Sequence, residues 1–276
     1  MTLKLTHMPL RSVLASAALA LFSLVAAASS APKHATQAAP AASPSTTVPT
    51  AVVDAIKAGI AKLNPNASAV QSVTFSPIPG MYEVLVDGQL LYSDATGKNI
   101  VVGQMIDSST HDNITNRHLD NAYKLAPNSL PTADSIVSYK TGDGSRKLLI
   151  FEDPDCGYCK HLEPELAKLK DTTVYVAMIE ILGENSKLHG HAIACASDSS
   201  AAWRDWMTSG RLPESPAPDT CAGDATVASN AQLARKLGVS STPTYYFLDG
   251  TRARGTMPAD VLQARLDEIA SGTKTR

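Results

Sequence analysis

The sequence predicts an α/β protein with two domains, preceded by a segment that belongs to neither. Three observations support this prediction. In the second half of the chain, short apolar runs typical of buried strands alternate with stretches of helical period. One helical stretch followed by strand and hairpin signals over residues 51–110 predicts a small α+β domain. Residues 1–50 show no pattern that predicts a folded core.

Composition excludes several classes of protein. The chain has 276 residues with 24 Lys+Arg against 26 Asp+Glu. It therefore lacks the basic excess that a nucleic-acid partner requires, and we expect no such partner.

Lys4 and Arg11 precede an apolar stretch at 13–28 that ends in three alanines, which is typical of a cleavable signal peptide over 1–28. A single N-terminal membrane anchor is the alternative.

Residues 29–50 consist largely of Ala, Pro, Ser and Thr, a composition typical of a flexible lead. A helix is then predicted from Ala51 to about Asn64, because apolar residues recur there at helical spacing. The helix is followed by predicted strands over 72–75, 81–86, 89–93 and 100–106, with Asp87-Gly88 as a tight turn between the second and third. So small a domain, 51–110, buries little surface, so we expect a second copy to pair with it in a homodimer.

A helical linker is predicted over 111–137, and an α/β domain over 138–276. Its expected elements are a buried strand at 147–151, a helix at 160–170, a strand at 174–181, a helical insertion at 184–237, strands at 244–248 and 251–254, and a helix at 259–270.

The motif Cys156-Gly157-Tyr158-Cys159 lies between a predicted buried strand and a helix. A cysteine at a helix N-terminus faces free N–H groups and the positive end of the dipole, which favour its thiolate. Cys159 follows one turn later, within reach of a mixed disulfide on Cys156. The motif therefore predicts redox chemistry at this dithiol.

Zinc binding and a structural bridge are the alternatives for this motif. Zinc takes four ligands, yet Cys195 and Cys221 are far apart in sequence and form no second C-x-x-C motif. A bridge over two residues closes almost no loop and adds little stability. We expect neither metal nor cofactor.

Thr242-Pro243 precedes a predicted strand. A proline there fits the start of an edge strand, where its missing N–H costs nothing. It fits equally a cis peptide beside the dithiol loop, with the Thr242 backbone free to pair with a substrate chain.

The order of these elements and motifs resembles the thioredoxin fold, and residues 51–270 resemble the DsbC/DsbG family of periplasmic disulfide isomerases. Pro79-Gly80-Met81 and Leu91-Tyr92 resemble that family's dimerisation domain. The Gly-Tyr dipeptide between the cysteines and the threonine before the proline resemble the DsbC branch. Pro164 and the acidic Asp153-Pro154-Asp155 lead-in depart from the pattern, and a carboxylate close to the thiolate would raise its pKa.

The resemblance implies a set of roles. Cys156 and Cys159 would be catalytic, while Gly157, Tyr158, Thr242 and a cis Pro243 would bind substrate. Cys195 and Cys221 would form a permanent disulfide; a second redox pair is the alternative, although nothing in the sequence around them predicts activation. The implied partners are a second copy, misfolded disulfide-containing exported proteins, and a membrane reductase of the DsbD type as electron donor.

Other polar and aromatic residues receive plainer interpretations. Trp203 and Trp206 are expected to pack the insertion onto the domain, and His189 and His191 to lie at the surface. Glu152 and Asp153 fit either proton transfer for Cys159 or simple loop acids. The functional hypothesis is a periplasmic disulfide isomerase and reductase; a DsbG-like reductase of narrow specificity and a holdase chaperone are the alternatives.

Overall fold

The computed structural model describes residues 47–131, 137–214 and 217–272. The predicted signal peptide at 1–28 and all but the end of the predicted lead at 29–50 lie outside these residues. Within the described part of the chain, no helix is long and apolar enough to cross a membrane.

The N-terminal sheet is antiparallel, with strand order β1-β2-β3-β4. Its elements are α1 (Thr50–Leu63), β1 (Ser72–Phe75), β2 (Met81–Val86), β3 (Gln89–Asp94), β4 (Ile100–Val101) and, after it, α2 (Ile114–Ala122). Side chains of β2 alternate between two small cores: Val84 packs with Ile56 of α1, and Leu85 packs with Leu119 of α2. The predicted Asp87-Gly88 turn is present, and both of its residues have positive φ, as a tight hairpin turn requires.

The predicted strand over 100–106 is too long. Only Ile100 and Val101 pair with β3, and Ile106 forms a single isolated bridge to Asn113. The extended pattern that follows Val101 is therefore an edge segment without a neighbouring strand among the described residues. Val101, Val102 and Ile106 are all at least half exposed.

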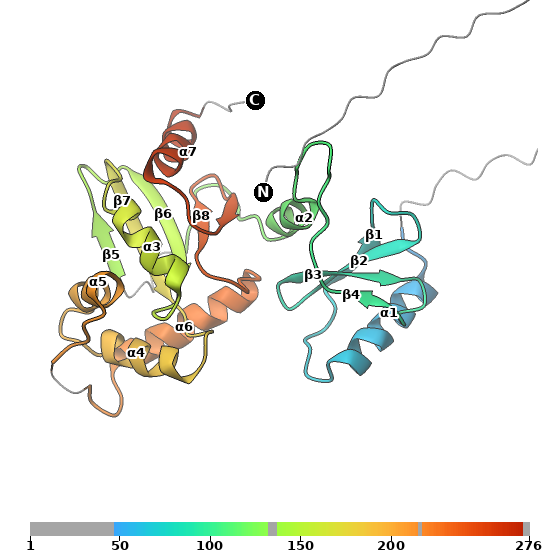
Figure 1. Ribbon diagram of the computed structural model, residues 1–276, viewed down its shortest axis with the longest axis horizontal. Helices are drawn as coiled ribbons and strands as arrows, with labels where there is room; N and C mark the ends of the chain where they lie inside the picture. The colour runs from blue at the N-terminus through green and yellow to red at the C-terminus, as the bar shows by residue number, and fades with distance from the viewer. Residues whose placement is uncertain (1–46, 132–136, 215–216, 273–276) are drawn as a thin grey trace, which may run out of the picture. The chain divides into compact units, whose positions relative to one another are not determined.

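The C-terminal sheet has strand order β5-β7-β6-β8-β9 (Figure 1). The strands are β5 (Val137–Lys140), β6 (Arg146–Glu152), β7 (Thr172–Met178), β8 (Thr244–Phe247) and β9 (Arg252–Arg254). The helices are α3 (Gly157–Leu166), α4 (Glu184–Ala194), α5 (Ser199–Ser209), α6 (Ala222–Lys236) and α7 (Ala259–Ser271). The edge strand β5 was not predicted, because its Val-Ser-Tyr-Lys sequence is short and half polar.

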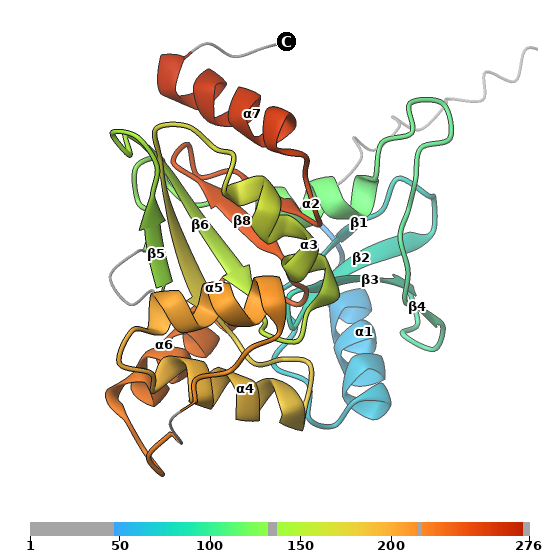
Figure 2. The same ribbon diagram turned by 60° about the vertical axis from the view of Figure 1, so that its left-hand side comes forward.

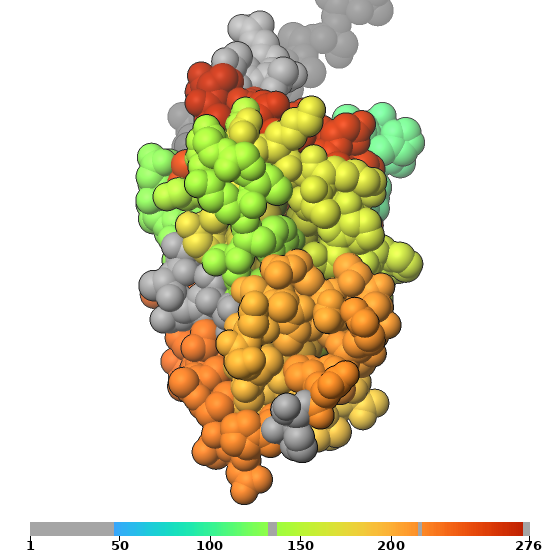
Figure 3. Space-filling model, turned by 90° about the vertical axis from the view of Figure 1, so that its left-hand side faces the viewer, coloured from blue at the N-terminus to red at the C-terminus, as the bar shows by residue number. Residues whose placement is uncertain are grey.

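Strand β6 is central and buried on both faces, which explains its continuous apolar run. Leu148 and Ile150 face the core formed with α3, α5 and α7, whereas Leu149 and Phe151 face α6. Figure 2 shows α3 and α5 in front of the sheet, and Figure 3 shows the orange insertion residues beside the yellow-green surface of α3. The sheet therefore fixes the position of the chain that leaves the end of β6.

Candidate active site

The loop after β6 places Cys156 at the N-cap of α3. The backbone N–H of Cys159 donates a hydrogen bond to Cys156 Sγ at 3.3 Å. An unpaired N–H of the first helical turn thus points at the sulfur that is to carry negative charge. Because the helix begins at Gly157, it starts earlier than the sequence pattern predicted.

The pKa of Cys156 is lowered to about 6. Hydrogen bonding from Cys159 is the main cause, and burial opposes it; Thr242 and the backbone N–H groups of the first turn add to the lowering. The thiolate therefore predominates at neutral pH. Since thiolates rather than thiols attack disulfides, Cys156 has the properties of the nucleophile.

Cys159 has the opposite character. It is fully buried, and its pKa is raised, first by burial, then by its hydrogen bond to Cys156 and by the charge of Glu152. The two sulfurs are therefore strongly asymmetric: one is charged and the other holds its proton. A buried thiol of this kind becomes a nucleophile only after it loses its proton.

Thr242 and Pro243 lie beside the dithiol, on the loop before β8. Their peptide bond is cis. The carbonyl oxygen of Thr242 lies 3.4 Å from Cys156 Sγ and accepts a hydrogen bond from it when the thiol is protonated. Gly157 is exposed, and Tyr158 is 69% exposed. The residues expected to bind substrate therefore surround the sulfur of Cys156 and leave accessible surface next to it.

Asp155 precedes the nucleophile directly, and its charge would raise the pKa of Cys156 if it lay close to the thiolate. Its carboxylate instead bonds to Nδ1 of His189 at 2.7 Å. The His189 ring packs on Trp206, whose indole N–H donates to the carbonyl oxygen of Pro154 at 2.7 Å. The insertion thus binds the active-site loop through Trp206, as predicted, and His189 has a structural contact that the sequence did not indicate.

Asp153 is fully buried and holds two loops together. One carboxylate oxygen accepts hydrogen bonds from the backbone N–H groups of Ile181 and Leu182 and from the hydroxyl of Ser186. The other accepts from the N–H of Asp155. These bonds make Asp153 a structural residue, which agrees with the plainer of the two interpretations given for it.

Glu152 differs from its neighbour. It ends β6 and is fully buried, and neither carboxylate oxygen has a hydrogen-bond partner of normal geometry among the described residues. Burial raises its pKa well above the ordinary value, and the charges of Glu163 and Cys156 raise it further. An acidic residue that ends an otherwise apolar buried strand is the sequence signal for such a group.

Cys195 and Cys221 form a disulfide that joins the end of α4 to the start of α6. The surroundings are more polar than expected: His191 Nδ1 lies 3.6 Å from Cys195 Sγ and bonds to Asp224 at 2.7 Å. His191, Cys195 and Asp224 lie close enough to share a metal ion. However, the Cys195 sulfur is in the disulfide and both His191 nitrogens have partners, so this cluster has no free set of donors.

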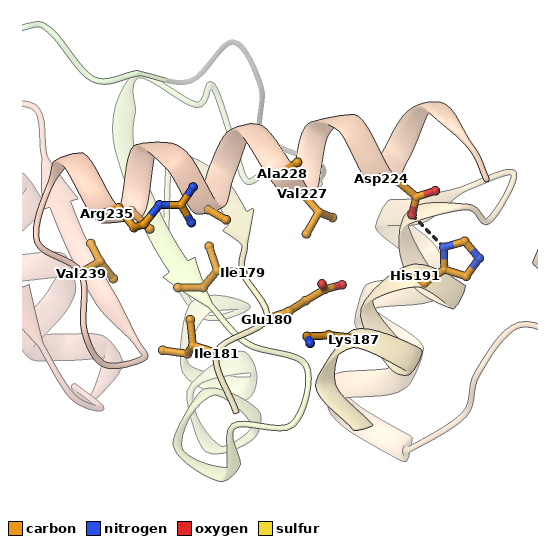
Figure 4. A pocket seen from close by; sticks show the side chains of 12 residues that line it. Ile179, Glu180, Ile181, Lys187, His191, Asp224, Val227, Ala228, Arg235 and Val239 are labelled. Atoms are coloured by element: carbon orange, nitrogen blue, oxygen red, sulfur yellow. Dashed lines mark hydrogen bonds and ion pairs between the residues drawn. The ribbon is translucent and has the colours of Figure 1, made fainter. Parts of the chain in front are cut away.

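A cavity of about 410 Å³ lies between the end of β7, α4 and α6 (Figure 4). Apolar side chains such as Ile179 and Val227 line it, together with Glu180, Lys187 and His191. Burial raises the pKa of Glu180 to about 7, and the charges of Asp153 and Asp224 contribute. Neither cysteine of the dithiol lines this cavity, which separates it from the site around Cys156.

Comparison with known proteins identifies the family. Residues 31–116 match the disulfide bond isomerase protein N-terminal domain, and residues 134–270 match a thioredoxin-like domain. The thiol:disulfide interchange protein DsbC of Escherichia coli K12 is 30% identical over 220 residues, which cover 78% of this chain and 87% of that protein. The chain belongs to the DsbC family.

The chain is also similar to two further disulfide interchange proteins. The probable thiol:disulfide interchange protein DsbC of Bordetella parapertussis is 37% identical over 187 residues, 68% of this chain. That alignment spans 65% of the Bordetella protein, slightly under two thirds of its length. A crystal structure of a disulfide interchange protein from Neisseria gonorrhoeae is 31% identical, with a TM-score of 0.44, and covers 53% of this chain and 100% of that one. The expected thioredoxin-like fold with a DsbC N-terminal domain is confirmed.

Proposed function

We propose that this protein is a thiol:disulfide interchange enzyme that reduces and isomerises non-native disulfides in exported proteins. The observation that carries the proposal is the asymmetry of the dithiol, with the pKa of Cys156 lowered to about 6 and that of Cys159 raised. Family membership supports the same chemistry, since the relatives are thiol:disulfide interchange proteins.

The reaction begins when the Cys156 thiolate attacks one sulfur of a substrate disulfide. A mixed disulfide forms between Cys156 and the substrate, and the second substrate sulfur leaves as a thiolate. Gly157, Tyr158, Thr242 and Pro243 lie beside the attacking Cys156 and are proposed to hold the substrate chain. The backbone of Thr242, whose carbonyl oxygen lies 3.4 Å from Cys156 Sγ, is the contact that a substrate strand would use.

The mixed disulfide then resolves by one of two routes. If another substrate thiol attacks the substrate sulfur, the substrate exchanges one disulfide for another and Cys156 returns as a thiolate, which is isomerisation. If Cys159 attacks Cys156, the substrate leaves reduced and the dithiol becomes a disulfide, which is reduction. The oxidised pair then needs electrons from a dithiol donor, and we propose a membrane reductase of the DsbD type.

We propose a homodimer in the periplasm as the working form. The exposed apolar edge at Val101, the last residue of β4, and Val102, which follows it, supports the dimer because an unpaired apolar edge favours pairing with another chain. The signal-like segment at 1–28 supports export. An oxidising compartment also suits the Cys195–Cys221 disulfide.

Refolding of scrambled, multi-disulfide ribonuclease tests the function. The chain is expected to restore ribonuclease activity, and Cys156→Ser to abolish this, because the only other free thiol, Cys159, is buried and protonated. A narrow reductase would hardly restore activity, and a holdase would suppress aggregation equally well after Cys156→Ser. Appreciable turnover by that variant would overturn the assignment of the nucleophile.

A further inference from the structure

A cluster of polar side chains is buried behind Cys159. Strand alternation places Glu152 on the same face of β6 as Leu148 and Ile150, the face that α3 covers. Cys159 and Glu163, four residues apart on α3, are both on the buried side of that helix. Glu163 accepts a hydrogen bond from the indole N–H of Trp203 at 2.7 Å. The insertion thus contributes to the surroundings of the dithiol.

Several polar atoms of this cluster lack partners. Within the described residues, both oxygens of Glu152 and the hydroxyl groups of Tyr139 and Tyr245 are buried without a hydrogen bond of normal geometry. An unpartnered buried carboxylate is costly. The cost is explained if the group exchanges a proton during the reaction.

The pKa values of Glu152 and Cys159 are shifted in the same direction. Burial raises the pKa of both, so the carboxylate is a far stronger base than an ordinary glutamate. Hydrogen bonding from Cys159 is the one influence that lowers the pKa of Glu152. The two groups also face the same core, since Cys159 packs with Leu148 and Ile150 and strand alternation places Glu152 on their face of β6.

Resting on the proposed function, we propose that Glu152 accepts the thiol proton of Cys159 in the resolving step, with Glu163 as a residue that tunes it through its charge. As the proton moves to the Glu152 carboxylate, Cys159 Sγ attacks Cys156 Sγ. The Cys156–Cys159 bond forms, the bond from Cys156 to the substrate breaks, and the substrate sulfur leaves as a thiolate that takes up a proton from water. The dithiol is oxidised and the substrate disulfide is reduced.

The charge on Cys156 determines at which stage of the reaction Glu152 can accept the proton. In the resting enzyme the Cys156 thiolate raises the pKa of Glu152 and favours its protonated form. In the mixed disulfide that charge is gone, so Glu152 is more readily ionised at the stage when Cys159 must lose its proton. Isomerisation does not use Cys159, so it does not depend on Glu152. Glu152 therefore sets the rate of reduction relative to isomerisation for each mixed disulfide.

An aromatic disulfide reagent, 5,5′-dithiobis(2-nitrobenzoate), separates the two steps on the reduced full-length chain. Attack by Cys156 releases one coloured thiolate, and attack by Cys159 on the resulting mixed disulfide releases a second. Glu152→Gln is expected to leave the first release unchanged and to slow the second at least about tenfold at pH 7, since a general base contributes about 10²–10⁴-fold. In the variant, the second rate should rise in proportion to hydroxide concentration.

Control variants distinguish this role from a structural one. Glu163→Gln keeps an acceptor for Trp203 but removes a charge, so it should shift the pH profile of the second release and leave the first release unchanged. Glu184→Gln makes the same chemical change on the exposed side of α4 and should change neither release.

The outcomes separate this inference from the proposed function. If wild type gives no first release, the proposed function fails. If Glu152→Gln gives normal first and second releases at every pH, the proposed function stands and the role of Glu152 is overturned. In case this variant does not fold, ¹³C NMR of glutamate-labelled wild type gives an independent test. The Glu152 carboxyl should titrate well above the ordinary range and shift when Cys156 is blocked; titration as an ordinary glutamate would refute the proposal.

Discussion

At the scale of single residues, the reactivity of Cys156 depends on three groups around one sulfur. The most important is Cys159, whose hydrogen bonding lowers the pKa of Cys156 against the effect of burial. Thr242 and the N–H groups of the first turn of α3 assist. Cys159 therefore has two roles: it lowers the pKa of Cys156 before the attack, and it is proposed to act as the resolving thiol afterwards.

This arrangement predicts the pH dependence of alkylation. The group whose pKa is lowered is charged above that pKa, so the rate of reaction with iodoacetamide should be constant at neutral pH and fall below a midpoint of about pH 6. Cys159→Ala should move the midpoint upward, toward the value of an ordinary cysteine, because the main lowering cause is lost. A midpoint that stays near 6 in Cys159→Ala would show that the helix N-terminus alone sets the acidity.

The sequence predicted the two cysteines because their spacing and their place before a helix carry the chemistry directly. It did not distinguish Glu152 from Asp153. They are adjacent acids at the end of one apolar run, and only the fold shows that Asp153 has four donors while Glu152 has none of normal geometry. Partner identity depends on segments distant in sequence, such as 181–186, which no local pattern reveals.

At the scale of secondary structure elements, the active-site loop depends on the start of α4. Asp153 Oδ2 connects the residues before Cys156 to the backbone of Ile181 and Leu182 and to Ser186. Asp153→Ala should lower the free energy of unfolding by about 3 kcal/mol or more, because several buried donors lose a charged acceptor. Urea unfolding followed by tryptophan fluorescence measures this. Asp143→Ala, which removes an exposed loop carboxylate, should have an effect near zero; equal effects would contradict the role of Asp153.

The insertion is held by the Cys195–Cys221 disulfide, whose cysteines are 26 residues apart in sequence. Replacing both with alanine should lower the free energy of unfolding by about 3–4 kcal/mol in the chain-entropy model. The first thiolate release by Cys156 should be unchanged, since its hydrogen bonds come from α3 and the Thr242 loop. A parallel loss of that release in a folded variant would indicate a redox role for the second pair.

Elements were predictable where one pattern dominated. The hairpin of β2 and β3 followed from alternation and the Asp-Gly turn, and β6 from its apolar run. The strand predicted over 100–106 was wrong beyond Val101, because an extended pattern specifies a conformation but not a pairing partner. Strand β5 was missed for the converse reason: its residues are held by pairing with β7, not by their own preference.

At the scale of the whole molecule, a carboxylate with a raised pKa makes the free energy of unfolding depend on pH. The pKa of Glu180 rises from 4.5 to about 7, so the folded state binds this proton more tightly than the unfolded state. Stability from this group is therefore present below pH 4.5 and lost as pH rises toward 7. Asp153, Asp224, Lys187 and His191 all act on Glu180.

Glu180→Gln should remove this pH-dependent loss. We compare the free energy of unfolding of the variant with that of wild type at pH 4.5 and at pH 8. The difference, variant minus wild type, should be about 1–2 kcal/mol more positive at pH 8, after allowance for solvent screening of a half-buried group. The pKa of His191 is also raised, chiefly by Asp224, so its contribution to stability is likewise lost as pH rises. Because both proteins contain His191, the difference between their stabilities isolates the contribution of Glu180. Parallel stability curves from pH 4.5 to 8 would refute this account.

Assembly is the remaining property of the whole molecule. Val102 is 69% exposed on the edge segment after β4, and an aspartate there would place a charge where a second chain is proposed to pair. Val102→Asp is therefore expected to give a monomer by light scattering. Leu63→Asp, at an apolar position that is 60% exposed and ends α1, should remain a dimer.

The two activities should respond differently to this loss of assembly. The monomer keeps Cys156, Cys159 and Pro243 in one domain, so reduction of insulin should persist at the wild-type rate. Isomerisation of scrambled ribonuclease should fall sharply, because a substrate held at two surfaces stays near the thiolate through repeated exchanges, whereas one held by a single strand escapes after the first. If Val102→Asp is monomeric and still refolds scrambled ribonuclease as fast as wild type, isomerisation needs only one catalytic domain, and the dimer serves another purpose.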